Sequence, residues 1–170
     1  MAGTVTGEVM VYVGLGANLG DALGTLAAAV QSLSELPHTR WLATSPLYRT
    51  QPVDAAGPDY LNAVAQLRTS LSAHDLLAAL QGIESAHGRE RPYRNAPRTL
   101  DLDLLLYGDD IIQTPMLTVP HAQMHQRAFV LVPLACLAPD VVVPGRGPVQ
   151  SLLAGVADQR IQRIDSQALS

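Results

Sequence analysis

The chain has 170 residues, a hydrophobic content of 48% and a net charge of −4, which together fit one globular domain with a sizeable core. The negative charge argues against a broad nucleic-acid or anionic-membrane surface, and no apolar run is long enough to span a membrane. Lysine is absent, and this excludes a Walker-type P-loop and the strand lysine of protein kinases. Phosphate binding must therefore use arginine, histidine, backbone N–H groups or metal.

We predict one domain over residues 9–158, preceded by a flexible leader at 1–8 and followed by a polar tail at 159–170. The leader lacks the basic start and apolar core of a secretory signal. The single cysteine, Cys136, excludes an internal disulfide and lies in an apolar run, so we expect it to be buried. These features predict a cytoplasmic protein, and we expect a monomer.

The first strand is predicted at Val9–Val13, and it runs into the glycine-rich segment Gly14–Asp21. The glycine pattern, G-x-G-x-x-x-G, is one residue longer than the Rossmann dinucleotide-binding fingerprint. We therefore predict a tight turn that walls a pocket, because glycine permits close backbone approach. A helix should follow up to Pro37, since apolar residues recur at spacings of three and four: Leu19, Leu23, Leu26, Val30 and Leu33.

Two strand-like segments come next, Thr39–Leu47 with an interruption at Pro46 and Tyr60–Leu67 with clear alternation. Tyr60 and Asn62 share the polar face of the second segment. They are placed to stack on and hydrogen-bond a flat heterocycle. Equally, Tyr60 could cap the sheet end and Asn62 could bond a neighbouring loop.

A second helix is predicted after the capping box Ser72–Asp75, and Gly88 ends it. Its apolar stripe consists of Leu76, Leu77, Leu80 and Ile83. Gln81, Glu84 and His87 lie off that stripe, and Glu84 is placed to touch a ligand or an arginine. The polar stretch 88–97 contains two prolines and is typical of a loop that closes over a substrate.

The most informative stretch is Arg98–Tyr107, whose core reads as a strand. Alternation puts Asp101 and Asp103 on one face, about 6.6 Å apart. Mg²⁺ takes carboxylate oxygens together with substrate phosphates, and arginine binds phosphate with paired donors. The preceding segment supplies a cluster of arginines: Arg89, Arg91, Arg94 and Arg98. A metal–nucleotide site is one interpretation, and an edge strand with a solvated polar face is the other.

The remaining elements complete an α+β pattern. His121 follows Pro120 and could bind phosphate or cap a helix, and the residue alone favours the cap. The predicted elements are a turn at Gly108–Asp110, a short strand at Ile111–Ile112, a helix from Ala128 to about Leu137 with a kink or early stop at Pro133, a strand at Val141–Val143 and a short helix near Ser151–Ala157. The order βαββαβ predicts a ferredoxin-like sandwich of an antiparallel sheet and helices, with the C-terminal third as decoration.

Five motifs now coincide in one order over about residues 9–145: Gly16–Gly20, Tyr48–Thr50, Pro58–Ala63, Pro97–Asp103 and Thr118–His121. With them the chain resembles the 6-hydroxymethyl-7,8-dihydropterin pyrophosphokinase family. The resemblance implies that the β,γ-pyrophosphoryl group of ATP moves to the pterin hydroxymethyl group in folate biosynthesis, leaving AMP.

The resemblance also implies residue roles. Asp101 and Asp103 would hold two Mg²⁺ ions that bridge the triphosphate. Arg89 and Arg91 would close on the phosphates as catalytic residues. Further ATP contacts would come from Gln81, Glu84, Arg98, His121 and Arg127. The pterin pocket would use Thr50, Val53, Tyr60, Asn62 and Phe129, with Asn62 reading the ring edge and Phe129 stacking on it.

The chain departs from the family pattern at a few positions. Asn95–Ala96 stands where many relatives have Trp-Gly, Ala17 stands where serine is usual, and Gln51 replaces a common proline. None of these changes removes an expected metal ligand. Two rival classes are a regulatory domain that binds nucleotide without Mg²⁺ and, more weakly, a Rossmann dehydrogenase.

Overall fold

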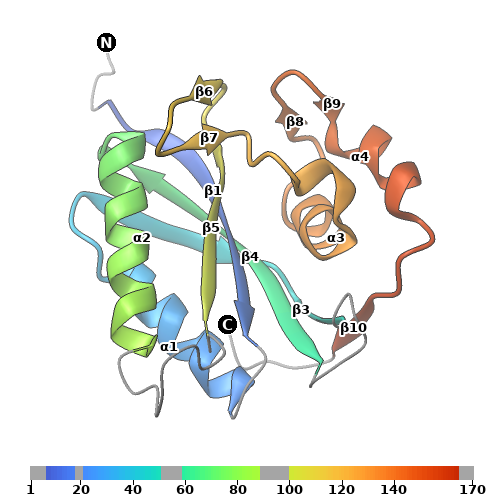
Figure 1. The fold of residues 1–170 in the computed structure, drawn as a ribbon, viewed down its shortest axis with the longest axis horizontal. Helices are drawn as coiled ribbons and strands as arrows, with labels where there is room; N and C mark the ends of the chain where they lie inside the picture. The colour runs from blue at the N-terminus through green and yellow to red at the C-terminus, as the bar shows by residue number, and fades with distance from the viewer. Residues whose placement is uncertain (1–6, 18–20, 51–58, 89–99, 165–170) are drawn as a thin grey trace.

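A computed structural model describes residues 7–17, 21–50, 59–88 and 100–164. Its centre is a six-stranded sheet with the strand order β10-β3-β4-β1-β5, in which β2 also pairs with β4 (Figure 1). All pairings in this sheet are antiparallel. The strands are β1 (Val9–Ala17), β2 (Thr39–Thr44), β3 (Leu47–Thr50), β4 (Tyr60–Thr69), β5 (Asp101–Tyr107) and β10 (Gln162–Ile164).

Helices cover both faces of the sheet (Figure 1). The helices are α1 (Ala22–Ser34), α2 (Ala73–Gly88), α3 (Ala128–Leu137) and α4 (Val149–Leu152). Short elements complete the description: β6 (Ile112–Gln113), β7 (Thr118–Val119), η1 (Met124–Gln126), β8 (Val142–Val143), β9 (Gly147–Pro148) and η2 (Leu153–Val156). The order β1–α1–β2/β3–β4–α2–β5 confirms the predicted ferredoxin-like α+β sandwich.

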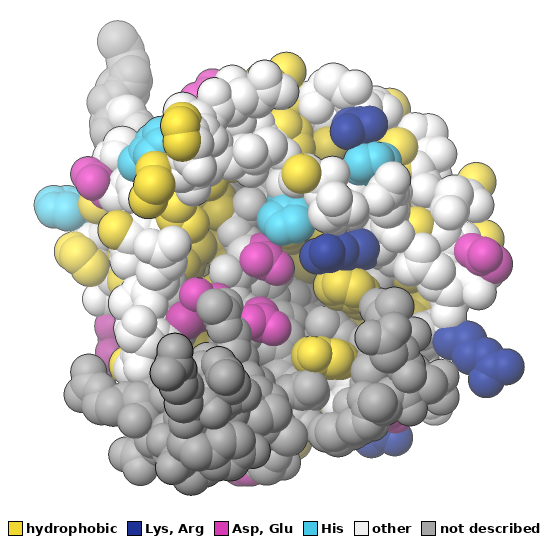
Figure 2. Space-filling model, viewed as in Figure 1, with side chains coloured by type: hydrophobic (Ala, Val, Ile, Leu, Met, Phe, Trp, Pro, Cys, Tyr) yellow, Lys and Arg dark blue, Asp and Glu magenta, His cyan; other side chains and the backbone are white. Residues whose placement is uncertain are grey.

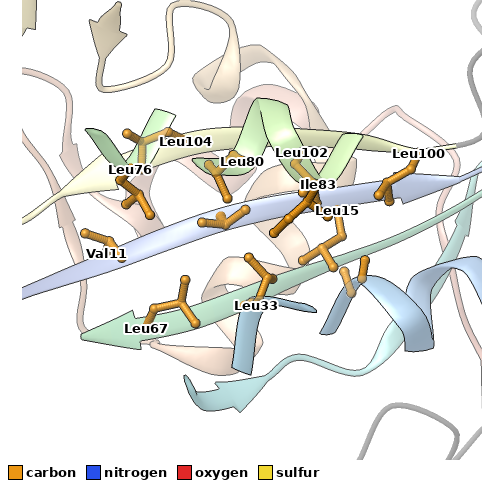
Figure 3. Packing of buried hydrophobic residues seen from close by; sticks show 14 of the residues in the cluster. Val11, Leu15, Leu33, Leu67, Leu76, Leu80, Ile83, Leu100, Leu102 and Leu104 are labelled. Carbon is orange, nitrogen blue, oxygen red and sulfur yellow. The ribbon is translucent and has the colours of Figure 1, made fainter. Parts of the chain in front are cut away.

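Each face of the sheet has its own apolar core. Under α1 and α2, leucines from the helices meet those of β1, β4 and β5, and Figure 3 shows Leu80 and Ile83 of α2 near Leu102 of β5. The other core lies under α3 and includes Val64, Leu105 and Leu131. The predicted alternation in β5 is therefore confirmed, because Leu102 and Leu105 belong to opposite cores.

The predicted break at Pro46 divides one strand into β2 and β3, which both pair with β4. Proline has no backbone N–H to donate to the sheet. Ser45 bridges the break: its N–H donates to the Val64 carbonyl at 2.8 Å, and its hydroxyl accepts from the Val64 N–H at 2.9 Å. The partner strand β4 thus stays continuous while its neighbour is interrupted.

The glycine-rich turn predicted at Gly14–Asp21 is wrong for its first four residues. Gly14–Ala17 belong to β1, which pairs with β4 on one side and β5 on the other. A central strand gains two ladders of backbone hydrogen bonds, and these outweigh the weak strand preference of glycine. Residues 18–20 lie outside the described part of the chain.

Helix α1 buries a somewhat different stripe from the predicted one. Leu26 and Leu33 are fully buried, as expected, together with Ala29, whereas Leu23 is 37% exposed. Leu19 lies outside the described residues. Asp21 caps the helix, because its carboxylate accepts a hydrogen bond from the Gly24 N–H at 2.9 Å.

Helix α2 begins as its capping box predicts. The Ser72 hydroxyl accepts from the Asp75 N–H at 3.1 Å, and Leu76, Leu80 and Ile83 are buried. Within this helix Gly82 has open space where a Cβ would project.

Gly82→Ala is expected to raise the free energy of unfolding by about 0.5–1 kcal/mol, because alanine restricts the unfolded chain and fits the helix without a clash. Urea denaturation measures this change. Gly24→Ala is the matched control, since a Cβ there would collide with the Asp21 carboxylate that caps α1. If both alanine variants raise the free energy of unfolding equally, helix propensity alone determines the change, and the contact of the Gly24 position with Asp21 has no effect on stability.

Three predictions for the C-terminal third need correction. Helix α3 continues through the buried Pro133 to Leu137, so an early stop is wrong. Cys136 is exposed rather than buried, because the buried face of α3 runs through Leu131, Leu134 and Ala135. The stretch expected to be a polar tail contributes β10, which pairs with β3.

The short strand expected at Ile111–Ile112 is present one residue later, as β6 at Ile112–Gln113, which pairs with β7. In the part of the chain that the structure describes, no helix is long and apolar enough to cross a membrane.

Candidate functional site

Asp101 and Asp103 lie on one face of β5, as the alternation predicts. In the sheet register Asp101 lies opposite Gly16 and Asp103 opposite Gly14 on the neighbouring strand β1. Glycine has no side chain, so neighbouring side chains fill these positions of β1: Leu105 lies over Gly14 and the Asn62 amide lies beside Gly16. The Asp103 side chain is 43% exposed and thus accessible to a ligand. Figure 2 shows acidic, histidine and arginine side chains gathered in the middle of the viewed face.

Strand β5 is an edge strand, and two contacts from outside the sheet hold it. The Glu84 carboxylate accepts a hydrogen bond from the Leu102 N–H at 2.7 Å, between the two aspartates. The His121 N–H donates to the Leu105 carbonyl at 3.0 Å. These contacts fix the strand that carries the paired acids.

The His121 ring lies between a backbone N–H group and Asp103. Its Nδ1 accepts from the Gln123 N–H at 3.1 Å, and Nε2 lies 4.0 Å from Asp103 Oδ1. Gln123 is the N-cap residue of η1, which has no side-chain cap hydrogen bond, so His121 does not cap this helix as expected. Burial lowers the pKa of His121; the nearby Asp103 opposes this effect and the charge of Arg127 adds to it. A neutral ring with Nδ1 as acceptor carries its proton on Nε2, which faces Asp103.

Arg127 and Phe129 lie together at the start of α3. The Arg127 guanidinium is 5.5 Å from the centroid of the Phe129 ring, within cation–π range, and both side chains are half-buried. Since the charge of Arg127 also acts on His121, this pair belongs to the same neighbourhood as Asp103.

A second polar group lies across the sheet from the aspartates. Asn62 on β4 lies opposite Gly16, which in turn lies opposite Asp101. Asn62 is 6% exposed, and its Oδ1 accepts from the Thr50 hydroxyl at 2.8 Å. This bond assigns the Asn62 NH₂ group to the side of Gly16, where a Cβ would come within 3.1 Å of it. Tyr60, which is half-buried, pairs with Thr50 in the strand register.

The buried Tyr48 is also opposite Asn62, on β3. Burial raises the pKa of the Tyr48 phenol to about 12, with the neighbouring Cys136 thiol adding to the shift. Tyr48 is therefore neutral, and this end of the sheet face carries no negative charge from it.

Gly16→Ala is expected to weaken a ligand bound beside Asn62 by about tenfold, because the new methyl group would displace an amide that the Thr50 hydroxyl holds in place. Titration of the protein with 6-hydroxymethyl-7,8-dihydropterin measures the change in Kd. Gly155→Ala is the control, since its Cβ would meet no atom within 4 Å. An unchanged Kd for the Gly16 variant would contradict the assigned amide position.

The structure thus brings together most predicted residues that it describes. Asp101, Asp103, Glu84, His121, Arg127 and Phe129 surround β5 and the start of α3, while Thr50, Tyr60 and Asn62 lie across β1. Gln81 is exposed on α2. Val53, Arg89, Arg91 and Arg98 lie outside the described residues. Gly16, from the glycine segment expected to wall a pocket, lies between Asn62 and Asp101, but as part of β1 rather than of a turn.

The chemistry of the donor set fits a hard divalent cation. Within the described ranges, no group of three or more His, Cys, Asp or Glu side chains could hold a metal by itself. Two carboxylates on one strand face, with the Asp103 side chain 43% exposed, suit Mg²⁺, which commonly takes one or two protein ligands and completes its shell with phosphate and water.

The fold and the site define the class: a ferredoxin-like protein with paired carboxylates on an edge strand and a hydrogen-bonded Thr50–Asn62 pair across the same sheet face. Among solved structures with this fold is Plasmodium falciparum HPPK-DHPS, wild type with pteroate, with a TM-score of 0.69 and 13% identity. The match covers 86% of this chain and 44% of that chain, and it supports the fold.

Sequence relatives give the family. The proteins named 2-amino-4-hydroxy-6-hydroxymethyldihydropteridine pyrophosphokinase from Pseudomonas aeruginosa and Haemophilus influenzae are 47% and 42% identical over 155 and 158 residues. These matches cover 91% and 92% of this chain and 96% and 99% of the relatives. The model of the 7,8-dihydro-6-hydroxymethylpterin-pyrophosphokinase (HPPK) family matches residues 12–139. The chain belongs to this family, and the resemblance found in its motifs is confirmed.

Proposed function

We propose that this protein transfers the β,γ-pyrophosphoryl group of ATP to the hydroxymethyl oxygen of 6-hydroxymethyl-7,8-dihydropterin, a reaction of folate biosynthesis. The observation that carries the proposal is one row of the sheet, Asp101–Gly16–Asn62. It joins a carboxylate suited to metal–phosphate binding with an amide suited to a heterocycle edge. Two strand spacings separate their backbones by about 9.6 Å, which lets two bound substrates meet over Gly16.

Asp101 and Asp103 would hold two Mg²⁺ ions together with the triphosphate oxygens. When bound, Mg²⁺ neutralises phosphate charge and aligns the attacking and leaving oxygens. The chain's own contribution is to present both carboxylates from a strand fixed by Glu84 and His121. We assign Glu84 mainly to this contact with Leu102, beside its expected place in the ATP site.

The phosphates would be met by His121 Nε2–H and the Arg127 guanidinium. Both groups lie near Asp103 on the described part of the site. Arg89, Arg91 and Arg98 are proposed as further phosphate contacts, and Gln81 as a nucleotide contact on α2. Arginine donates paired hydrogen bonds that match phosphate oxygens, so several such donors spread the charge that develops during transfer.

The pterin would lie over Gly16, with its ring edge against Asn62 and its flat face against Phe129. The Thr50 hydroxyl orients the Asn62 amide, and Tyr60 and Val53 are proposed as further contacts. An asparagine amide offers both a donor and an acceptor, which suits the alternating groups on a pterin edge.

In the transfer itself the pterin hydroxymethyl oxygen forms a bond to the β-phosphorus, and the bond from that phosphorus to the α,β-bridging oxygen breaks. The hydroxyl proton leaves to solvent, and AMP departs with the bridging oxygen. Little covalent chemistry is required of the protein, so positioning and electrostatic stabilisation account for the rate.

Phosphorus NMR of the protein with ATP, Mg²⁺ and 6-hydroxymethyl-7,8-dihydropterin tests the proposal. We expect AMP and a pterin diphosphate to appear together. ADP in place of AMP would mean attack at the γ-phosphorus, and the proposed alignment would be wrong. ATP binding without turnover and without any need for Mg²⁺ would favour the regulatory-domain alternative.

A further inference from the structure

A side chain from the stretch expected to be a tail reaches the start of α3. Gln159 Oε1 accepts a hydrogen bond from the Ala128 N–H at 2.9 Å, and Gln159 Nε2 donates to the Gln126 carbonyl at 2.8 Å. The two bonded groups flank Arg127 on either side. The Gln159 amide therefore hydrogen-bonds the backbone on both sides of Arg127, from more than thirty residues away in the sequence.

The Gln159 side chain supplies the hydrogen bond that a helix-capping side chain would otherwise make at the start of α3. Arg127 is the N-cap residue of α3 and makes no side-chain cap hydrogen bond. The first N–H groups of a helix have no partner inside it, and Gln159 supplies one for Ala128. The Arg127 carbonyl accepts from Val130 and Leu131, so the backbone is held on both sides of this extended residue, with φ −125° and ψ 114°.

The held backbone sets where two functional side chains project. Arg127 lies over the Phe129 ring at 5.5 Å, and its charge acts on His121. The side chain of Arg127 projects from its backbone, so a change in φ or ψ at Arg127 would move the guanidinium away from Phe129 and His121. No hydrogen bond of the guanidinium to either residue is among the described contacts that could prevent this movement.

The segment that carries Gln159 is held in place on both sides of this residue. Its N–H donates to the Val156 carbonyl at 3.0 Å, and Val156 is buried in the core under α3. Three residues later β10 begins, and β10 pairs with β3, the strand that carries Thr50. The segment from η2 to β10 thus connects the Arg127 side of the site with the Thr50 side.

We infer that Gln159 is a positioning residue that fixes Arg127 and Phe129 for substrate binding. The inference rests on the proposed function, in which Arg127 contacts phosphate and Phe129 stacks on the pterin. No catalytic contact is assigned to Gln159 itself, since both of its amide bonds go to backbone groups.

Steady-state kinetics of Gln159→Ala in the full chain tests the inference. We expect KM for ATP and KM for the pterin to rise roughly tenfold each, from loss of the two hydrogen bonds, with kcat within about twofold of the wild type. Gln159→Glu keeps an acceptor for Ala128 and loses the donor to Gln126, so its KM values should fall between those of the wild type and the alanine variant. Circular dichroism at the assay temperature measures the folded fraction.

Gln150→Ala is the matched control. Gln150 is an exposed glutamine of α4 whose side chain donates to the Pro139 carbonyl at 3.4 Å, so its KM values should stay at the wild-type level. A merely structural role for Gln159 would lower kcat with the folded fraction and leave both KM values unchanged, and this result would overturn the inference. Wild-type protein that forms no AMP would instead overturn the proposed function, so the two failures are distinguishable.

Discussion

Replacing Asp101 or Asp103 with asparagine is expected to lower kcat for AMP formation by at least about a hundredfold, since loss of groups that merely support metal ligands already costs 10–100-fold. Each substitution removes one negative charge from the face of β5 that lies opposite Gly16 and Gly14. Asparagine keeps the size and shape of the side chain, so the effect measures charge and metal affinity. The phosphorus NMR assay gives the rate, and a Mg²⁺ titration gives the metal dependence.

The Asp103→Asn variant should remain folded. The contact of Asp103 with His121 is 4.0 Å long and partly exposed, so its loss costs less than about 1 kcal/mol. Asp109→Asn is the control, because Asp109 is an exposed carboxylate in the turn just after β5. If all three variants lose activity to the same degree, general charge around β5 matters and the two-aspartate assignment is wrong.

Asn62→Leu is expected to raise the pterin KM by roughly a hundredfold with little change in ATP affinity. Leucine branches at the same carbon as asparagine, but it offers no hydrogen bond to a pterin and leaves the buried Thr50 hydroxyl without its acceptor. Isothermal titration with each substrate separates the two affinities. The rise in pterin KM should be the same at low and at saturating concentrations of ATP.

Gln66→Leu controls for the loss of an amide from the same strand. Gln66 lies four residues further along β4, and its Nε2 donates to the Tyr12 hydroxyl at 2.8 Å. We expect a lower melting temperature for this variant and an unchanged pterin KM. Equal rises of KM in both variants would show that sheet stability, rather than the Asn62 amide, controls pterin binding.

The sequence predicted those parts of the fold that depend on local periodicity. Alternation in β5 placed Asp101 and Asp103 on one face, and the capping box located the start of α2. The order of elements then gave the sandwich, because short connections between such elements restrict the topology.

Long-range pairing decided what local patterns could not. Gly14–Ala17 reads as a turn, yet β4 and β5 pair with it on both sides and make it strand. In the edge strand β10, Gln162 and Arg163 are polar and exposed and only Ile164 is apolar, so the segment lacks an apolar pattern. Gln159 carries no local signal at all, since its partners lie more than thirty residues earlier.

The contacts on the outer edge of β5 have a second consequence, which concerns association between copies of the chain. An edge strand presents unpaired backbone groups that can template pairing with another molecule. Here the Leu102 N–H already donates a hydrogen bond to the Glu84 carboxylate, and the Leu105 carbonyl already accepts one from the His121 N–H. A foreign strand would have to displace both contacts before it could add to the sheet. Residues that steady the site therefore also protect the protein against edge-to-edge aggregation.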